Sequence, residues 1–203
     1  MRDLRGVWVF LMQSSVALAV IQIKDRPAQG SLPLDMVCGL LFLVTFLCFY
    51  CGDQQLLRQE TKARIVLLSR DHLALLFQGA LFNWLALACT NPSLFVRTFG
   101  VLLVVNSLWL SHNRRRTIET SKNWSADTVE TKTVSLHCHE AAKVWASNNW
   151  ITAAALIGLE LTLQLNWLAK DAWVALGLLA IALNRVVDLK FTWWFYRSSF
   201  VKP

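Results

Sequence analysis

Residues 34–51 read LDMVCGLLFLVTFLCFYC, a stretch of 18 residues with a single charge at Asp35. An apolar run of this length matches a helix that crosses the hydrocarbon core of a bilayer. Five further runs of similar length follow the same pattern: Val7–Ile23, His72–Cys89, Leu94–Leu110, Trp150–Leu168 and Ala172–Val187. In lipid every backbone polar group must be satisfied internally, so each run is expected to be a helix in a bundle. The sequence therefore predicts an all-α integral membrane protein with six transmembrane helices, paired as three hairpins.

The composition supports one membrane-embedded unit. Of the 203 residues, 55% are hydrophobic and only 16% are charged, and the charges gather between the apolar runs. No linker is long enough to divide the chain, so we expect a single transmembrane domain over residues 1–203, with a cytoplasmic loop at 111–149. The net charge of +7 would suggest a nucleic-acid partner in a soluble protein. No aromatic platform accompanies the cations, and we expect no such partner.

The positive charges divide unequally between the two ends of the predicted helices. With six spans, 16 of the 20 Lys and Arg residues fall on the side that holds both termini, and four fall on the other. Cytoplasmic segments carry such an excess, so both termini and residues 111–149 are predicted to be cytoplasmic. The predicted location is the cell membrane, the cytoplasmic or inner membrane of the cell. The lipid bilayer, with its anionic headgroups, is the first expected partner.

Glu160 is the outstanding polar residue within a predicted span. It lies near the middle of the run Trp150–Leu168, and Gln164 follows one helical turn later on the same face. A charged side chain at such a depth costs about 2.5–3.5 kcal/mol on insertion scales, so Glu160 is expected to face the bundle interior. It should be either neutral or stabilised by a cation or water. Two interpretations stay open: a proton or cation site, or a hydrogen bond between helices.

Other polar residues occur on the cytoplasmic side of the centre of several spans. The last span carries Asn184, Arg185 and Asp188. Arg185 could pair with Asp188, extend to the interface, or reach towards Glu160. Three further candidates lie at a similar depth in other spans: Gln13, Gln78 and Asn106. These residues either form interhelical hydrogen bonds or line a water-filled vestibule.

Enzymatic and metal-binding signatures are scarce. The stretch His137-Cys138-His139-Glu140 contains metal-ligand residue types, but the four are consecutive and no second pair is spaced to complete a tetrahedral site. His137 and His139 are therefore candidate ligands only, and we expect no bound metal. The sequence lacks a nucleophile elbow, a Walker loop, an HExxH motif and paired histidines within the spans. We expect no catalytic residues and no cofactor, and a non-enzymatic role is favoured.

Together these features predict a small multi-pass membrane protein that forms an ion or small-solute conduit, resembling a channel or transporter, as a homo-oligomer. Glu160 would be the central selectivity or protonation residue, surrounded by Gln164, Arg185 and the other polar residues. The alternative is a non-catalytic accessory or assembly subunit of a larger membrane protein complex. The absence of a sharp site and the many aromatic residues support that alternative. A purified homo-oligomer that conducts would distinguish the first function from the second.

Overall fold

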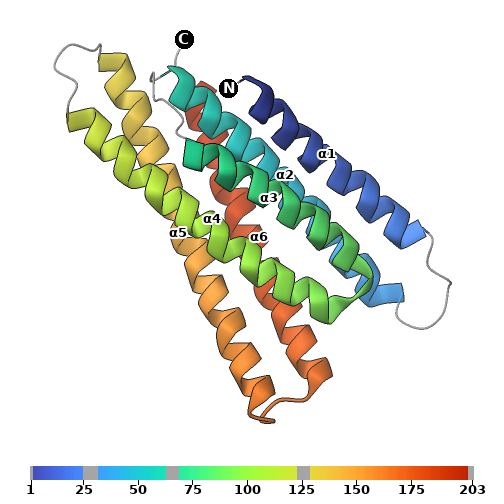
Figure 1. Ribbon diagram of the computed structural model, residues 1–203. Coiled ribbons are helices and arrows are strands. Elements are labelled where there is room, and N and C mark those ends of the chain that lie inside the picture. The colour runs from blue at the N-terminus through green and yellow to red at the C-terminus, as the bar shows by residue number, and fades with distance from the viewer. Residues whose placement is uncertain (1, 25–31, 63–68, 123–128, 201–203) are drawn as a thin grey trace.

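The computed structural model describes residues 2–24, 32–62, 69–122 and 129–200 (Figure 1). These ranges form six α-helices: α1 (Arg2–Lys24), α2 (Leu32–Lys62), α3 (Ser69–Leu87), α4 (Pro92–Lys122), α5 (Val129–Gln164) and α6 (Lys170–Phe200). A short 3-10 helix, η1 (Ala88–Thr90), joins α3 to α4. The described ranges contain no β-strand, so the all-α prediction is confirmed for this part of the chain.

Five of the described helices contain a segment long and apolar enough to cross a membrane: Gly6–Lys24, Leu34–Asp53, Leu73–Thr90, Pro92–His112 and Lys170–Trp194. Helix α5 is not among these five, so the prediction of six apolar spans is confirmed for five helices. The reason is where α5 ends. The run Trp150–Leu168 included residues beyond Gln164, whereas the helix itself stops at Gln164 and keeps polar Glu160 and Gln164 within its last turns.

The end of α5 is fixed by Asn166. This residue has a φ of 58°, a left-handed conformation that Asn tolerates better than most side chains. The N–H of Trp167 donates to the carbonyl of Thr162 at 2.9 Å, and the N–H of Asn166 donates to the carbonyl of Leu163 at 3.0 Å. This pair of hydrogen bonds is a Schellman motif, which closes a helix and turns the chain. Glu160 therefore lies one turn from the end of α5, and its predicted place near the middle of the helix is wrong.

The helices alternate in direction, as expected for three hairpins. The N-terminal end of α1 lies at the same end of the bundle as the C-terminal ends of α2, α4 and α6 (Figure 1). Residues 111–149, expected to form a loop, are largely the extensions of α4 to Lys122 and of α5 from Val129. Residues 123–128 lie outside the described ranges. The described part of this connecting segment is therefore helical.

Close packing joins α1 to α3 more extensively than to its neighbour in sequence, α2. At Gly79 of α3, an added Cβ would meet the Cβ of Leu11 at 2.9 Å, so only glycine allows the two helices to approach this closely. The Asn83 amide nitrogen donates to the Leu11 carbonyl at 2.8 Å, and the Ser14 hydroxyl donates to the Asn83 side-chain oxygen at 3.0 Å. These contacts fix α1 against α3 and leave α2 to pack towards the centre.

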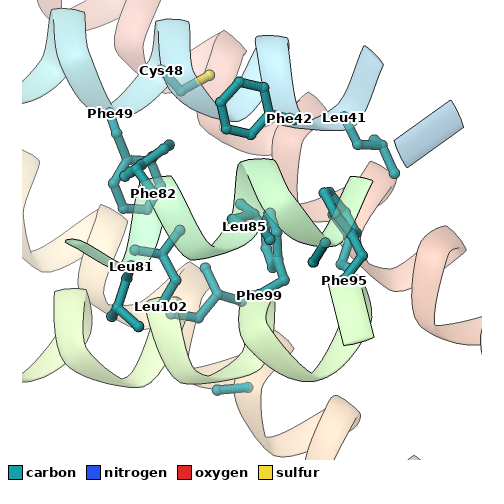
Figure 2. Close-up of a cluster of buried hydrophobic side chains, with 14 of the residues drawn as sticks. Leu41, Phe42, Cys48, Phe49, Leu81, Phe82, Leu85, Phe95, Phe99 and Leu102 are labelled. Atoms are coloured by element: carbon teal, nitrogen blue, oxygen red, sulfur yellow. The ribbon is translucent and has the colours of Figure 1, made fainter. Parts of the chain in front are cut away.

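An aromatic core fills the space between α2, α3 and α4 (Figure 2). Phe82 of α3 makes edge contacts with Phe42 and Phe49 of α2, with ring centroids 6.3 and 5.4 Å apart. On α4, Phe95 and Phe99 lie 6.1 Å apart and are fully buried. Rings in such edge and tilted geometries pack tightly. The centre of the bundle is therefore filled by side chains, and the polar residues gather on either side of this core.

Candidate functional site

The polar residues of α6 form a buried group with residues of α5. Nη2 of Arg185 lies 2.7 Å from Oδ2 of Asp188, and both side chains are at most 5% exposed. Nδ2 of Asn148 donates to Oδ1 of Asp188 at 2.6 Å, and Nδ2 of Asn184 donates to the hydroxyl of Thr152 at 2.9 Å. The side-chain oxygen of Asn184 accepts from Nε of Arg185 at 3.0 Å. Both oxygens of the carboxylate are thus satisfied, as a buried charge requires.

Aromatic rings cover the Arg185 guanidinium. Its central carbon lies 5.1 Å from the ring centroid of Phe49 and 5.4 Å from that of Phe99. The electron-rich face of an aromatic ring attracts a cation, and the attraction strengthens where water is excluded. Of the three arrangements that the sequence left open for Arg185, the structure has the local pair with Asp188. Arg185 lies three residues from the midpoint of the apolar segment Lys170–Trp194, about 4.5 Å along the helix axis.

Helices α2, α3 and α4 add polar groups to the same region. Nε2 of Gln78 donates to Oδ2 of Asp53 at 2.8 Å, which joins α3 to α2. Asn106 of α4 is 6% exposed, and its side-chain oxygen has no hydrogen-bond partner among the described residues. A cavity of about 20 Å³ is lined by Asp53, Asn106, Asp188 and Thr192 together with apolar neighbours. Its size and polar lining suit a single water molecule.

We call this set the inner polar cluster: Asp53, Gln78, Asn106, Asn148, Thr152, Asn184, Arg185 and Asp188. It unites five helices. Of the six polar residues expected at a similar depth in the spans or beside them on α6, it contains five: Gln78, Asn106, Asn184, Arg185 and Asp188. Gln13 does not belong to it, since its side chain is exposed on α1. The predicted polar layer is thus brought together by α3, α4 and α6 but not by α1.

Glu160 lies in a different place and has a different partner. Its carboxylate accepts from Nη2 and Nε of Arg97 at 3.0 and 3.2 Å, and from Nε2 of Gln164 at 3.0 Å. The side chains of Arg97 and Glu160 are 52% and 31% exposed, and the Arg97 guanidinium lies over the ring of Trp173 at 5.4 Å. We call Arg97 and Glu160 the outer ion pair. This bidentate arrangement, in which Nε and Nη2 each donate to one carboxylate oxygen, is typical of arginine with a carboxylate.

The expected arrangement, with Arg185 and the polar layer around Glu160, is therefore corrected. Asn148, which binds Asp188, precedes Glu160 by twelve residues on α5, about 18 Å along the axis. The sequence predicted that Glu160 is either neutral or stabilised by a cation or water. In the structure its partner is a cation, Arg97 of α4. In the sequence, Arg97 is one of the four cations on the less basic side.

The residues that the sequence analysis missed are Asp53, Asn148, Thr152 and Arg97. The positions of Asn148 and Thr152 in the α5–α6 hairpin could have identified these two residues from the sequence. In an antiparallel helix pair, residues equidistant from the turn lie opposite each other. Counted from residue 168 in the turn between α5 and α6, Asn148 and Asp188 are both 20 residues away, and Thr152 and Asn184 are both 16 residues away. Polar residues at mirrored positions thus indicate a contact across the hairpin.

The candidate metal ligands lie on the early part of α5. His137 falls within the helix, but its side chain lies outside the described residues, and His139 is half-buried. Within the described part of the chain, no group of three or more His, Cys, Asp or Glu side chains could hold a metal ion. The inner polar cluster instead combines two carboxylates with a guanidinium, amides and a hydroxyl, which are groups that exchange hydrogen bonds with water.

No family model, curated protein or solved structure matches this chain.

Proposed function

We propose that this is a multi-pass membrane protein with six spans that forms an ion or small-solute conduit, as a homo-oligomer in the cell membrane. The five apolar helices support the membrane assignment. Helix α5 packs along α4 and α6, and it connects the end of one to the start of the other at opposite ends of the bundle. If α4 and α6 cross the bilayer, α5 must cross it too. The 16-to-4 division of Lys and Arg supports cytoplasmic termini.

The Arg185–Asp188 pair is the observation that carries the proposal. A bundle of this kind can be held together by apolar and small side chains, and an ionised pair near the centre of a span is costly. Charged residues that face the interior of a membrane bundle commonly mark ion or proton pathways. The inner polar cluster adds a second carboxylate, Asp53, and a cavity large enough for one water molecule. We therefore assign ion or proton passage to this cluster.

In this proposal the outer ion pair is a second polar site along the pathway, after the inner polar cluster. Arg97 and Asn106 are nine residues apart on α4, about 14 Å along the axis. Between them lie the buried side chains of Phe99 and Leu102, which close the direct route in this conformation. Passage would require these apolar side chains to move. Glu160 then acts at the outer mouth, and Asp188 takes the central position first expected for Glu160.

The test is a flux measurement in proteoliposomes, with protons, sodium, potassium and chloride as separate probes. The informative variant is Arg185→Gln together with Asp188→Asn, which removes both charges and leaves polar side chains that can still form hydrogen bonds. We expect a folded protein whose flux falls at least about tenfold, which corresponds to 1.4 kcal/mol in the barrier. Asp171→Asn, an exposed carboxylate on the first turn of α6, is the matched control and should leave flux unchanged.

A folded wild-type protein that transports none of the four ions would contradict the conduit. Full flux in the charge-free double variant would contradict the assignment of passage to the Arg185–Asp188 pair, and would show that this pair within α6 has only a structural role. Unfolding midpoints of wild type and variant, measured in the same detergent, separate a loss of flux from a loss of fold.

The alternative function, an accessory or assembly subunit of a larger membrane complex, is supported by the filled core of the described bundle. Phe42, Phe82 and Phe99 are fully buried in the core between α2, α3 and α4 (Figure 2). The mass of the purified protein in lipid nanodiscs distinguishes the two functions. A homo-oligomer that conducts supports the conduit. A non-conducting chain that is recovered from native membranes with other subunits supports the accessory role.

A further inference from the structure

Two cavities meet at the outer ion pair. The first, of about 480 Å³, lies at the start of α4 and α6, and its polar lining comes from Asn91, Ser93, Arg97 and Lys170. The second, of about 440 Å³, runs along α4 and α5 beside Glu160. Arg97 and Trp173 line both cavities, so the two are neighbours across these side chains. We call them the head cavity and the tail groove.

The head cavity presents hydrogen-bond donors. Lys170 contributes an ammonium group, and Arg97 keeps Nη1 available because Nε and Nη2 bind Glu160. The side-chain oxygen of Asn91 accepts from the N–H of Leu94 at 3.2 Å, which leaves its amide NH₂ as a donor. The helices α4 and α6 begin at this cavity, so the positive ends of two helix dipoles lie beside it. None of the residues that line it is a carboxylate. This chemistry suits a phosphate group.

The tail groove is apolar apart from the outer ion pair, which lies at one end beside Trp173. It is lined by Gly100, Val101, Val104, Val105, Leu156 and Ile157. From Arg97 to Val105 the groove follows α4 for eight residues, about 12 Å along the axis. Val101 and Ile157 are 49% and 55% exposed, so the groove is open on the outer face of the bundle. Gly100 deepens it, because an added Cβ would meet no atom closer than 3.7 Å.

We propose that these cavities bind one anionic phospholipid, with its phosphate in the head cavity and an acyl chain in the tail groove. The head cavity lies where the apolar segments Pro92–His112 and Lys170–Trp194 begin, which is the level of the headgroups for helices that span a bilayer. Arg97 then holds Glu160 with two nitrogens and the phosphate with the third. This site depends on the membrane assignment but not on transport.

The test measures lipid retained by the purified full-length protein by native mass spectrometry, after exchange into phosphatidylglycerol or phosphatidylcholine. We expect retention of the anionic lipid to exceed that of the zwitterionic lipid by about tenfold, the effect of one charge-assisted contact. Arg97→Gln together with Lys170→Gln should remove the preference. Lys190→Gln, an exposed cation near the other end of α6, should not change it. Gly100→Leu should lower retention of both lipids by narrowing the tail groove.

Glu160→Gln distinguishes direct binding of the phosphate by Arg97 from a purely structural role of the Arg97–Glu160 ion pair. It leaves the Arg97 charge in place, so retention should stay equal or rise. If Glu160→Gln lost the anionic lipid as fully as the Arg97 and Lys170 variant, the ion pair would be structural and the site would be overturned. Two further results would also overturn it: equal retention of both lipids by wild type, and displacement of the lipid by millimolar inorganic phosphate, which would indicate a site for a soluble anion. Retention is measured without flux, so its failure is distinguishable from failure of the conduit.

Discussion

The protein contains two arginine–carboxylate pairs in opposite surroundings. Arg185 and Asp188 are three residues apart on one helix, almost wholly buried, and covered by Phe49 and Phe99. Arg97 and Glu160 come from two helices and are 52% and 31% exposed. The free-energy cost of disrupting the ion pair is therefore expected to differ greatly between the two sites. A buried pair is costly to disrupt because its partner stays charged without water, whereas an exposed pair contributes little.

The largest effect is expected from breaking the buried pair on one side. Asp188→Leu leaves the Arg185 guanidinium buried without its counter-charge, so the free energy of unfolding should fall by about 3–5 kcal/mol. Arg185→Met combined with Asp188→Leu removes both charges and should recover most of that loss. Unfolding in mixed detergent micelles, followed by circular dichroism, measures both. Equal destabilisation in the single and double variants would contradict the buried-charge account.

A smaller effect is expected from the neighbour that supports the buried carboxylate. Asn148→Leu removes the hydrogen bond to Asp188 and should cost about 1–3 kcal/mol, because a buried acceptor is left unsatisfied. The matched control is the adjacent Asn149. Its side chain is 1% exposed, and neither its nitrogen nor its oxygen has a hydrogen-bond partner among the described residues. Asn149→Leu should therefore be neutral or stabilising, and the reverse ranking in the same unfolding assay would break the comparison.

The position of the outer ion pair depends on the end of α5. Asn166→Val places a β-branched side chain at a φ of 58° and should cost about 1–2 kcal/mol, whereas Asn166→Gly should be tolerated. The expected local result is a frayed last turn of α5 in the valine variant. Hydrogen exchange at residues 160–164 reports it directly. Unchanged protection in Asn166→Val would show that packing, rather than the Schellman motif, ends the helix.

The smallest effect on stability is expected at the exposed pair itself. Glu160→Gln should change the free energy of unfolding by only about 0.2–1 kcal/mol, since exposed pairs are worth little. The contribution of the pair should also fall as salt is raised, because exposed charges are screened. A double-mutant cycle of Glu160→Gln and Arg97→Gln at low and high salt measures the coupling. A coupling as large as that of Arg185 with Asp188, and insensitive to salt, would remove the distinction between the two pairs.

Much of the architecture follows from the sequence. Runs such as residues 34–51 are long and apolar, and the polar segments between them set the number of helices and their alternating direction. Period and length are local properties, so they can be read without knowing the fold. The local pair of Arg185 and Asp188, at a spacing of one helical turn, was accessible in the same way.

Only the tertiary structure decided which polar residues meet. Glu160 binds Arg97, 63 residues earlier in the chain, because α4 and α5 pack side by side. Gln78 meets Asp53 across α2 and α3, while Gln13 stays exposed because α1 packs on α3 through Leu11 and Ser14. The end of α5 likewise depended on one backbone conformation at Asn166 rather than on hydropathy. Hydropathy reports how apolar a segment is, but helix rotation and neighbour choice come from side-chain packing between segments, which no single segment contains.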